Sequence, residues 1–280
     1  MARRDREQNR RSWNAATVAH NSHKADQAAF LRRRGTTTLF PEELALLGSL
    51  RGKSLLHLQC NSGQDTLSLA KRGARVTGVD ISDEAIAFAQ ALSRDSGIPG
   101  RFLRADVYDY LAASRSTFDV VFCSYGVTGW LEDLGRWARG IARRLKRGGR
   151  FVYVEFHPVM FTFDERGRPA FPYSSHGVPL RGPGVTDYVH QSGDALTPSG
   201  YVTGVRDFVN PHGVVEFAWG VAEIVQAVID AGLRVDHFAE YDFSNGFAPF
   251  SGMRRQGNRY FPAKGQPRVP LMFSLRAVKP

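Results

Sequence analysis

The chain has 280 residues, of which 42% are hydrophobic and 23% charged, a balance typical of one large globular domain or two small ones. Its 28 glycines and 14 prolines are aperiodic, which excludes collagen-like and coiled-coil chains, and no run approaches the roughly 18–20 apolar residues that span a bilayer. The formal net charge of +10 leaves open nucleic acid, an acidic membrane or no charged partner.

The basic N-terminus and the two cysteines bear on location. No apolar segment follows the N-terminal basic residues, so we expect no secretory signal. Cys60 and Cys123 are too few for a disulfide scaffold and lie in strand-like surroundings, which predicts a reducing, cytoplasmic location. The cysteines do not suggest a metal site and the eight histidines show no ligand spacing, so we expect no bound metal.

Short apolar runs alternate with helix-length segments from residue 54 onward. The runs that predict strands are 54–58, 74–80, 101–106, 118–124 and 150–156. The segments with the apolar spacing of helices are 64–73, 83–94 and 131–149. Ser82 precedes the second of these helices and is a predicted N-cap. This alternation predicts parallel βαβ units with right-handed crossovers, and therefore a doubly wound α/β sheet.

The alternation stops after residue 156. The next sixty residues are rich in proline, glycine and aromatic side chains and keep no helical period. A predicted helix at 219–232 and predicted strands at 234–242 and 269–278 then follow, and 10–30 is a predicted helix before the sheet. An irregular insert of this length with many aromatic residues is typical of a functional cap.

We therefore expect three functional parts within one domain. An N-terminal helical lid covers 1–50, the α/β core covers 51–156 and 218–280, and a substrate cap covers 157–217.

Polar side chains follow the predicted strands at the edge where open parallel sheets bind ligands. The turn 59–65 opens a helix, whose free N–H groups can bind a carboxylate or phosphate. Asp80 ends the second strand, where a carboxylate can accept both ribose hydroxyls of a nucleoside. Asp106 ends the third strand and can accept from an adenine amine, and Ser124 and Tyr125 end the fourth. Singly these are turns or helix caps, but together they predict a nucleoside-cofactor site.

Over 50–156 and the two closing strands, the sequence resembles the class I S-adenosylmethionine-dependent methyltransferases. LLHLQCNSGQDTLSLAKRGARVTGVDISDEAI is similar to their glycine-rich motif and acidic second-strand motif in continuous order, and LRADVYD and FDVVFCS are similar to their adenine-binding and fourth-strand motifs. The resemblance implies a Rossmann-like, mostly parallel, seven-stranded sheet with an antiparallel last strand. It also implies S-adenosylmethionine as cofactor and S-adenosylhomocysteine as product. The cofactor-binding residues implied are Gln59, Cys60, Asn61, Gly63, Asp65, Asp80, Ile81, Asp106, Val107, Ser124 and Tyr125.

In these roles the turn after the first strand would hold the methionine part of the cofactor, Asp80 the ribose and Asp106 the adenine. The chain departs from the family pattern because His57 replaces its strand-one acid, and Gln59 and Asn61 replace its first two glycines. A turn with fewer glycines has less room for a pyrophosphate, which argues against a dinucleotide. Side-chain amide oxygens or backbone carbonyls can accept from the methionine ammonium.

Catalysis needs little more than alignment, because a sulfonium methyl group is already activated and a base is needed only if the acceptor loses a proton. His157 leaves the fifth strand at its carboxyl end and is the first candidate base, with Glu155 as a weak orienting partner. The competing interpretation is that His157 only terminates the strand with Pro158. His190, within the insert, is the second candidate.

The N-terminal helix is expected to lie over the cofactor, as the resemblance implies. Trp13, His20 and Tyr188 are the predicted lid or substrate contacts, although each alone fits an ordinary surface or core position. Aromatic residues of the insert can form the wall of an apolar pocket for a small acceptor.

Three functions remain possible on the sequence alone. The first is methyl transfer to oxygen, nitrogen or carbon of a small organic acceptor. The second is nucleic-acid methylation, which is weakened because the sequence has no Asn-Pro-Pro-Tyr-type motif and no separate RNA-binding module. The third is a protein that binds S-adenosylmethionine without catalysis.

The location of the charge favours the first function. Residues 1–34 have nine basic and three acidic residues, a net +6, and 251–280 have seven basic residues and no acid, so the chain between them has a net charge of −3. The positive charge therefore belongs to the two ends, which argues against nucleic acid as a partner and favours at most an anionic acceptor. We expect no membrane partner, and no pattern in the sequence indicates an oligomeric state.

Overall fold

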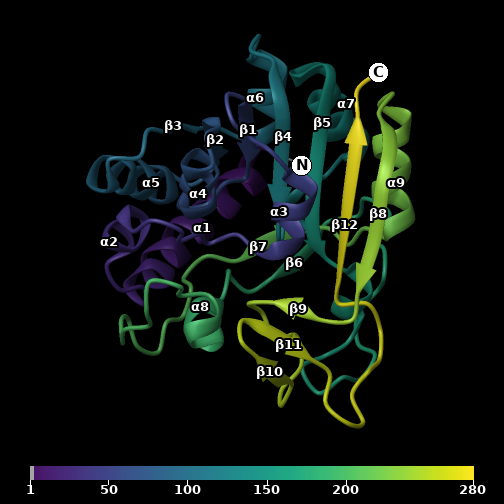
Figure 1. Ribbon diagram of the computed structural model, residues 1–280. Coiled ribbons are helices and arrows are strands. Elements are labelled where there is room, and N and C mark those ends of the chain that lie inside the picture. The colour runs from purple at the N-terminus through teal and green to yellow at the C-terminus, as the bar shows by residue number, and fades with distance from the viewer. Residues whose placement is uncertain (1–2) are drawn as a thin grey trace.

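The computed structural model describes residues 3–280, and seven of its strands form one sheet in the order β3-β2-β1-β4-β5-β12-β8 (Figure 1). Their bounds are β1 Ser54–Leu58, β2 Arg75–Asp80, β3 Arg101–Arg104, β4 Phe118–Ser124, β5 Leu145–Phe156, β8 Arg234–Tyr241 and β12 Met272–Val278. The first five pair in parallel, whereas β12 runs antiparallel to both β5 and β8. The predicted doubly wound sheet with an antiparallel last strand is confirmed.

Helices cover both faces of this sheet. They are α3 Pro41–Leu47, α4 Gln64–Lys71, α5 Asp83–Ser96, α6 Val107–Ala113, α7 Leu134–Arg144 and α9 Val221–Asp230. Alternate side chains of one strand point to opposite faces, so in β1 Leu56 packs with α6, α7 and α9 whereas Leu55 packs with α3 and α4. Because β1 and β4 are buried on both faces, their polar side chains lie mostly toward the strand ends.

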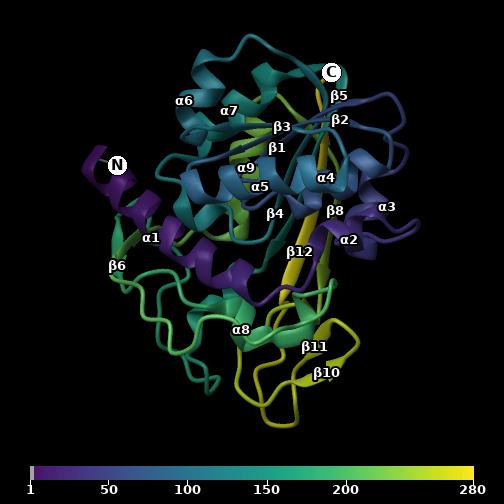
Figure 2. The same cartoon turned by 90° about the vertical axis from the view of Figure 1, so that its left-hand side faces the viewer.

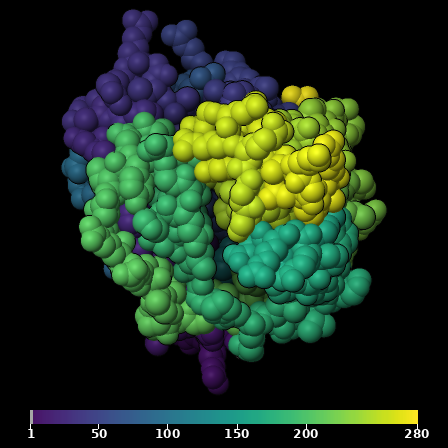
Figure 3. All heavy atoms as spheres, turned by 90° about the horizontal axis from the view of Figure 1, so that it is seen from below, coloured from purple at the N-terminus to yellow at the C-terminus, as the bar shows by residue number. Residues whose placement is uncertain are grey.

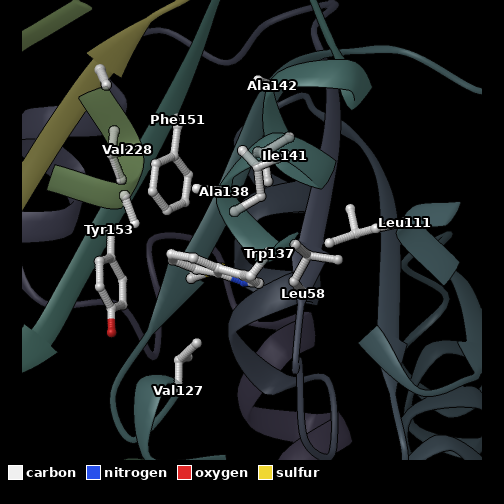
Figure 4. Packing of buried hydrophobic residues seen from close by; sticks show 14 of the residues in the cluster. Leu58, Leu111, Val127, Trp137, Ala138, Ile141, Ala142, Phe151, Tyr153 and Val228 are labelled. Atoms are coloured by element: carbon white, nitrogen blue, oxygen red, sulfur yellow. The ribbon is translucent and has the colours of Figure 1, made fainter. Parts of the chain in front are cut away.

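Trp137 is at the centre of the larger core cluster (Figure 4). Its indole, on α7, is fully buried, and its ring centroid lies 5.4 Å from that of Phe151 and 5.8 Å from that of Tyr153 on β5. Burying an aromatic side chain of this size contributes about 2–3 kcal/mol. This packing holds α7 against β5, the strand that leads into the insert.

Several helix bounds differ from the predicted ones for local reasons. The predicted helix 10–30 is two helices, α1 (Arg3–Ser22) and α2 (Gln27–Arg32), because the Asp26 side chain accepts from the Ala29 N–H at 2.8 Å and starts a new helix. The predicted helix 131–149 ends at Arg144, where β5 begins. Ser82 caps α5 by accepting from the Ala85 N–H at 3.1 Å, as predicted. The short helix α6 was not predicted.

Two irregular segments lie below the sheet in Figure 1, beside the carboxyl ends of its parallel strands. The insert contains η2 Pro158–Thr162, β6 Leu180–Gly182, α8 Tyr188–Ser192, η3 Gly193–Ala195 and β7 Val214–Glu216. The segment between β8 and β12 forms a three-stranded sheet of β9 Ser244–Asn245, β10 Arg254–Gln256 and β11 Arg259–Phe261. Figure 2 shows α1 crossing the molecule between α5 and α8, both of which it contacts. The division into lid, core and cap stays a prediction.

No helix within residues 3–280 has the length and apolar character needed to cross a membrane.

Candidate active site

A cavity of about 1030 Å³ lies at the carboxyl ends of the strands, between the core, α1, the insert and the β9–β11 segment. Seen from below, the molecule is hollowed between the insert and the segment after β8 (Figure 3). Every residue predicted to bind the cofactor lines this cavity except Gly63, and the predicted lid residues Trp13, His20 and Tyr188 line it too. The structure thus brings the predicted cofactor and lid residues together.

The turn after β1 keeps the backbone of a glycine-rich loop without its glycines. Gln59 and Asn61 have positive φ angles of 54° and 47°, in the left-handed region that glycine usually occupies. Asn61 stabilises this conformation with its own side chain, because its Oδ1 accepts from the Ser62 N–H at 2.6 Å. Gly63 has a φ of 77° and a packing role, since a Cβ there would lie 2.6 Å from that of Ala89 on α5.

Asp80 joins this turn to α5. Its Oδ2 accepts from the Asn61 N–H at 2.8 Å, and its Oδ1 accepts from the Ser82 N–H at 2.9 Å. Each carboxylate oxygen has more than one lone pair, so both can also accept from a ligand in the cavity. Burial raises the pKa of Asp80, and hydroxyl donors from a ribose would favour its charged form.

The methionine part of S-adenosylmethionine carries an ammonium group, and the Gln59 amide fits it. Gln59 Nε2 donates to the Val127 carbonyl at 3.1 Å, while its Oε1 is buried without a partner in the described chain. A buried acceptor left unpaired costs about 1–3 kcal/mol, which an ammonium donor would recover. His57 is not a substitute for the missing acid: it lies 2.8 Å from Thr66 Oγ1, and burial lowers its pKa to about 3.

Asp106 is both a helix cap and part of the cavity wall. Its Oδ1 accepts from the Tyr108 N–H at 2.9 Å and the Asp109 N–H at 3.3 Å, which starts α6. Arg6 lies 3.5 Å from the same oxygen. The Val107 N–H belongs to the first turn of α6 and has no intrahelical acceptor. A carboxylate oxygen beside a free N–H matches the donor and acceptor edge of adenine, so capping and binding are compatible here.

The N-terminal helix α1 is held on the core by polar contacts. Arg10 forms an ion pair with Asp83 at the start of α5, and Asn21 Nδ2 donates to Ser62 Oγ at 2.8 Å in the turn after β1. Part of the N-terminal positive charge is therefore used within the chain.

Trp13 and His20 lie on the face of α1 that lines the cavity. The Trp13 ring contacts Trp130, with centroids 5.4 Å apart, and the His20 ring contacts Tyr188 at 4.1 Å. His20 Nε2 lies 2.8 Å from the Thr186 carbonyl, which assigns the ring proton to this nitrogen. Burial lowers the pKa of His20 to about 4, so the ring is neutral at pH 7.

The three residues predicted for catalysis do not line the cavity. His157 Nε2 lies 2.9 Å from Glu240 Oε1, and its Nδ1 accepts from the Val159 N–H at 3.1 Å. It therefore caps η2 at the end of β5, which matches the strand-ending interpretation. His190 is exposed, with its Nδ1 2.7 Å from the Tyr201 hydroxyl. Neither imidazole is placed to take a proton inside the cavity.

Glu155 is buried behind the site and shapes the turn after β4. Its carboxylate accepts from the N–H groups of Gly126 at 2.5 Å and Val127 at 2.7 Å and from the Tyr153 hydroxyl at 2.6 Å. Tyr125, which precedes Gly126, has a positive φ of 44° and lines the cavity. Glu155 thus holds a strained turn that directs Tyr125, rather than orienting His157.

A polar group at the end of the cavity beyond Tyr125 was not predicted from the sequence. Asn245, on β9, donates through Nδ2 to the Tyr125 hydroxyl and to Glu42 Oε2, both at 3.0 Å. Arg259, on β11, forms an ion pair with the same Glu42. Aromatic rings complete this end of the cavity: Phe40, Phe156, Phe161 and Phe247. Apart from Phe156, which ends β5, these residues come from short elements and loops that carry no periodic signal.

Cys60 and Cys123 are buried free thiols. Within residues 3–280 no group of three or more histidine, cysteine, aspartate or glutamate side chains is arranged to hold a metal ion.

The sheet order and the strand-end site define the class I S-adenosylmethionine-dependent methyltransferase fold. Residues 56–153, about a third of the chain, match the family model described as a methyltransferase domain, so this stretch is similar to that domain.

Curated relatives match over part of the chain. Two proteins named ubiquinone biosynthesis O-methyltransferase are similar to this chain. That of Sodalis glossinidius is 31% identical over 106 residues, covering 38% of this chain and 42% of the relative. That of a Methylobacterium species is 29% identical over 135 residues, covering 48% and 51%. The aligned part of the chain thus spans about half the length of these relatives.

Solved structures match over most of the chain. An S-adenosylmethionine-dependent methyltransferase from Mesorhizobium loti has a TM-score of 0.55 at 22% identity, covering 88% of this chain and 99% of its own. A putative one from Listeria monocytogenes has a TM-score of 0.56 at 20% identity, covering 85% and 96%. At these identities the likeness establishes the fold.

Proposed function

We propose that the chain is an enzyme that transfers the methyl group of S-adenosylmethionine to oxygen, nitrogen or carbon of a small organic acceptor. The observation that carries this proposal is the single cavity that joins the strand-end residues Asp80 and Gln59 to the aromatic end beyond Tyr125. Such a cavity can enclose a nucleoside cofactor and an acceptor together and exclude water from both.

Three side chains are proposed to hold the cofactor, which supplies an activated methyl group when bound. Asp80 accepts from the ribose hydroxyls, Gln59 Oε1 accepts from the ammonium, and Asp106 with the Val107 N–H pairs with the adenine edge. The three side chains lie within two residues of a strand end, so they are held by the sheet itself. This rigidity would help to align the cofactor.

The acceptor is proposed to be partly apolar and aromatic. Phe40, Phe156, Phe161 and Phe247 offer ring faces to it. Asn245 and Arg259 offer polar contacts, although the Arg259 charge is already paired with Glu42. The pocket therefore supports an aromatic acceptor more strongly than an anionic one. The names of the curated relatives favour oxygen as the acceptor atom.

Proton handling at the acceptor is proposed to involve Tyr125 and His20. Burial raises the pKa of Tyr125 well above its usual value, so its hydroxyl keeps its proton. It can therefore contact the acceptor as a neutral hydrogen-bonding group. His20 is neutral, and its Nδ1 is buried without a partner in the described chain. An acceptor that must lose a proton would meet His20 as a neutral imidazole, which is a weak base because burial lowers its pKa to about 4.

Two measurements test this function. Isothermal titration with S-adenosylmethionine and S-adenosylhomocysteine should show one site per chain, and absence of binding would overturn the proposal. A transfer assay with methyl-labelled cofactor should then label small phenolic acceptors and leave tRNA and rRNA unlabelled. Labelling of RNA alone would favour a nucleic-acid methyltransferase, and binding without transfer to any acceptor pool would favour a protein that binds the cofactor without catalysis.

A further inference from the structure

Lys24 is a largely buried cation that faces the cavity. It lies two residues after the end of α1 and lines the cavity wall, yet its ammonium makes no hydrogen bond or ion pair within residues 3–280. The nearest opposite charge that acts on it is Asp65, on α4, whose Oδ1 accepts from the Thr38 hydroxyl at 2.5 Å. A desolvated ammonium without a partner is costly, so this arrangement indicates a binding site for an anion.

The course of α1 shows which end of the cavity this is. Arg6, near the start of the helix, lies 3.5 Å from Asp106, where adenine is proposed to bind. Asn21, at its other end, bonds to Ser62 in the turn after β1, where the methionine part is proposed to bind. The helix therefore runs along the cofactor site from the adenine end to the methionine end. Lys24, three residues beyond Asn21, lies at the methionine end.

Neighbouring polar side chains at this end are already paired. Gln64 Nε2 donates to Gln27 Oε1 at 2.7 Å and to Asn21 Oδ1 at 3.0 Å. Among these side chains, Lys24 is thus the charged donor left for a ligand, and the carboxylate is the anionic group of the methionine part.

We propose that Lys24 is the counter-ion of the cofactor carboxylate and closes the methionine end of the site. This inference rests on the proposed function, because it assumes that S-adenosylmethionine occupies the cavity. It adds a residue of the N-terminal segment to a site otherwise built on strand ends. The N-terminal segment would then form an ion pair with the cofactor as well as cover it.

The experiment pairs a protein variant with a matched ligand. Binding of S-adenosylhomocysteine and of its decarboxylated analogue is measured by isothermal titration for the wild type, Lys24→Met and the control Lys53→Met, which removes an exposed charge outside the cavity. Lys24→Met should weaken S-adenosylhomocysteine binding roughly 10- to 100-fold, the range for a charge-assisted contact. It should change binding of the analogue less than about twofold, and Lys53→Met should change neither.

Every other outcome overturns the assignment. Unchanged S-adenosylhomocysteine binding, or equal weakening of both ligands, would mean that Lys24 does not contact the carboxylate. A change confined to the KM of the acceptor would move Lys24 to the acceptor site. A wild type that binds neither ligand would overturn the proposed function itself, whereas a wild type that binds both equally tightly would overturn this inference alone.

Affinity against pH is a second readout that needs no variant to fold. Burial lowers the pKa of Lys24 to about 8, and a bound carboxylate would raise it. Binding should therefore be level below about pH 8 and weaken by up to about tenfold per pH unit above it. Asp65 on α4 and His20 on α1 also act on this ammonium, but His20, with a pKa of about 4, stays neutral in this range. A pH profile shared by both ligands would contradict the proposal.

Discussion

The two ends of the cavity are built in different ways. At the cofactor end, Asp80, Asp106 and Gln59 each lie within two residues of a parallel strand. At the acceptor end, Glu42 meets Asn245 and Arg259 across 203 and 217 residues of chain. One end is thus a product of local strand-to-turn geometry and the other of distant contacts. Cofactor binding should therefore change little when residues at the acceptor end are substituted. Variants at each end test whether the two ends are independent.

The largest expected effect is at the cofactor end. Asp80→Asn replaces one oxygen with an NH₂ group that faces a backbone N–H, and it removes the charge that would bind ribose. We expect S-adenosylhomocysteine affinity to fall at least about 100-fold, which corresponds to about 3 kcal/mol. Isothermal titration measures it, with the exposed Asp95→Asn on α5 as the matched control. Undiminished binding would separate Asp80 from the cofactor.

The same division explains what the sequence could predict. The strand ends were predictable because apolar runs and the residues that follow them set both the sheet and its polar edge. Gln59 and Asn61 departed from the family glycines, yet the turn keeps the glycine-like positive φ angles. Asn245 was not predictable, because β9 is two residues long and its neighbours are set by long-range packing. The structure of residues 157–217 was not predictable for the same reason, because its elements are short and are positioned by long-range packing.

His157 and Glu155 show where the strand-end argument fails. β5 pairs antiparallel with β12, so the chain after it is tied to this strand: the His157 N–H bonds to the Leu271 carbonyl at 2.9 Å. Its ring then meets Glu240, on β8, instead of the cavity. For His157, a position after a strand did not predict a place in the cavity, because the antiparallel pairing with β12 leads the chain toward β8.

Glu155 links the cofactor end of the cavity to the acceptor end. It holds the turn whose Val127 carbonyl binds Gln59 and whose Tyr125 faces the acceptor. Glu155→Gln puts an NH₂ group against backbone donors, so the free energy of unfolding should fall by about 2–3 kcal/mol. Chemical denaturation measures this, with the exposed Glu165→Gln as control. Cofactor and acceptor binding should both weaken, and loss of only one would show that the ends are separable here too.

Asn245→Ala should instead act at one end. It removes the amide that donates to both the Tyr125 hydroxyl and Glu42, so the Tyr125 side chain is held less firmly in its position. We expect the acceptor KM to rise about tenfold, about 1.4 kcal/mol, whereas S-adenosylhomocysteine binding changes less than about twofold. Ser251→Ala, on the exposed loop between β9 and β10, is the control. A parallel loss of cofactor binding would mean that distant contacts also support the strand-end site.

The smallest effect should come from His157→Ala. The residue lies outside the cavity, so kcat should stay within about twofold and its pH profile should not change. Stability should fall by about 1 kcal/mol, because the variant loses the cap of η2 and the contact with Glu240. Burial lowers the pKa of His157, so its share of the stability is present above about pH 6.5, the unperturbed value, and is lost as the pH falls. A tenfold drop in kcat at unchanged stability would place His157 in the mechanism, because only a group that handles the acceptor proton would lower turnover without weakening the fold.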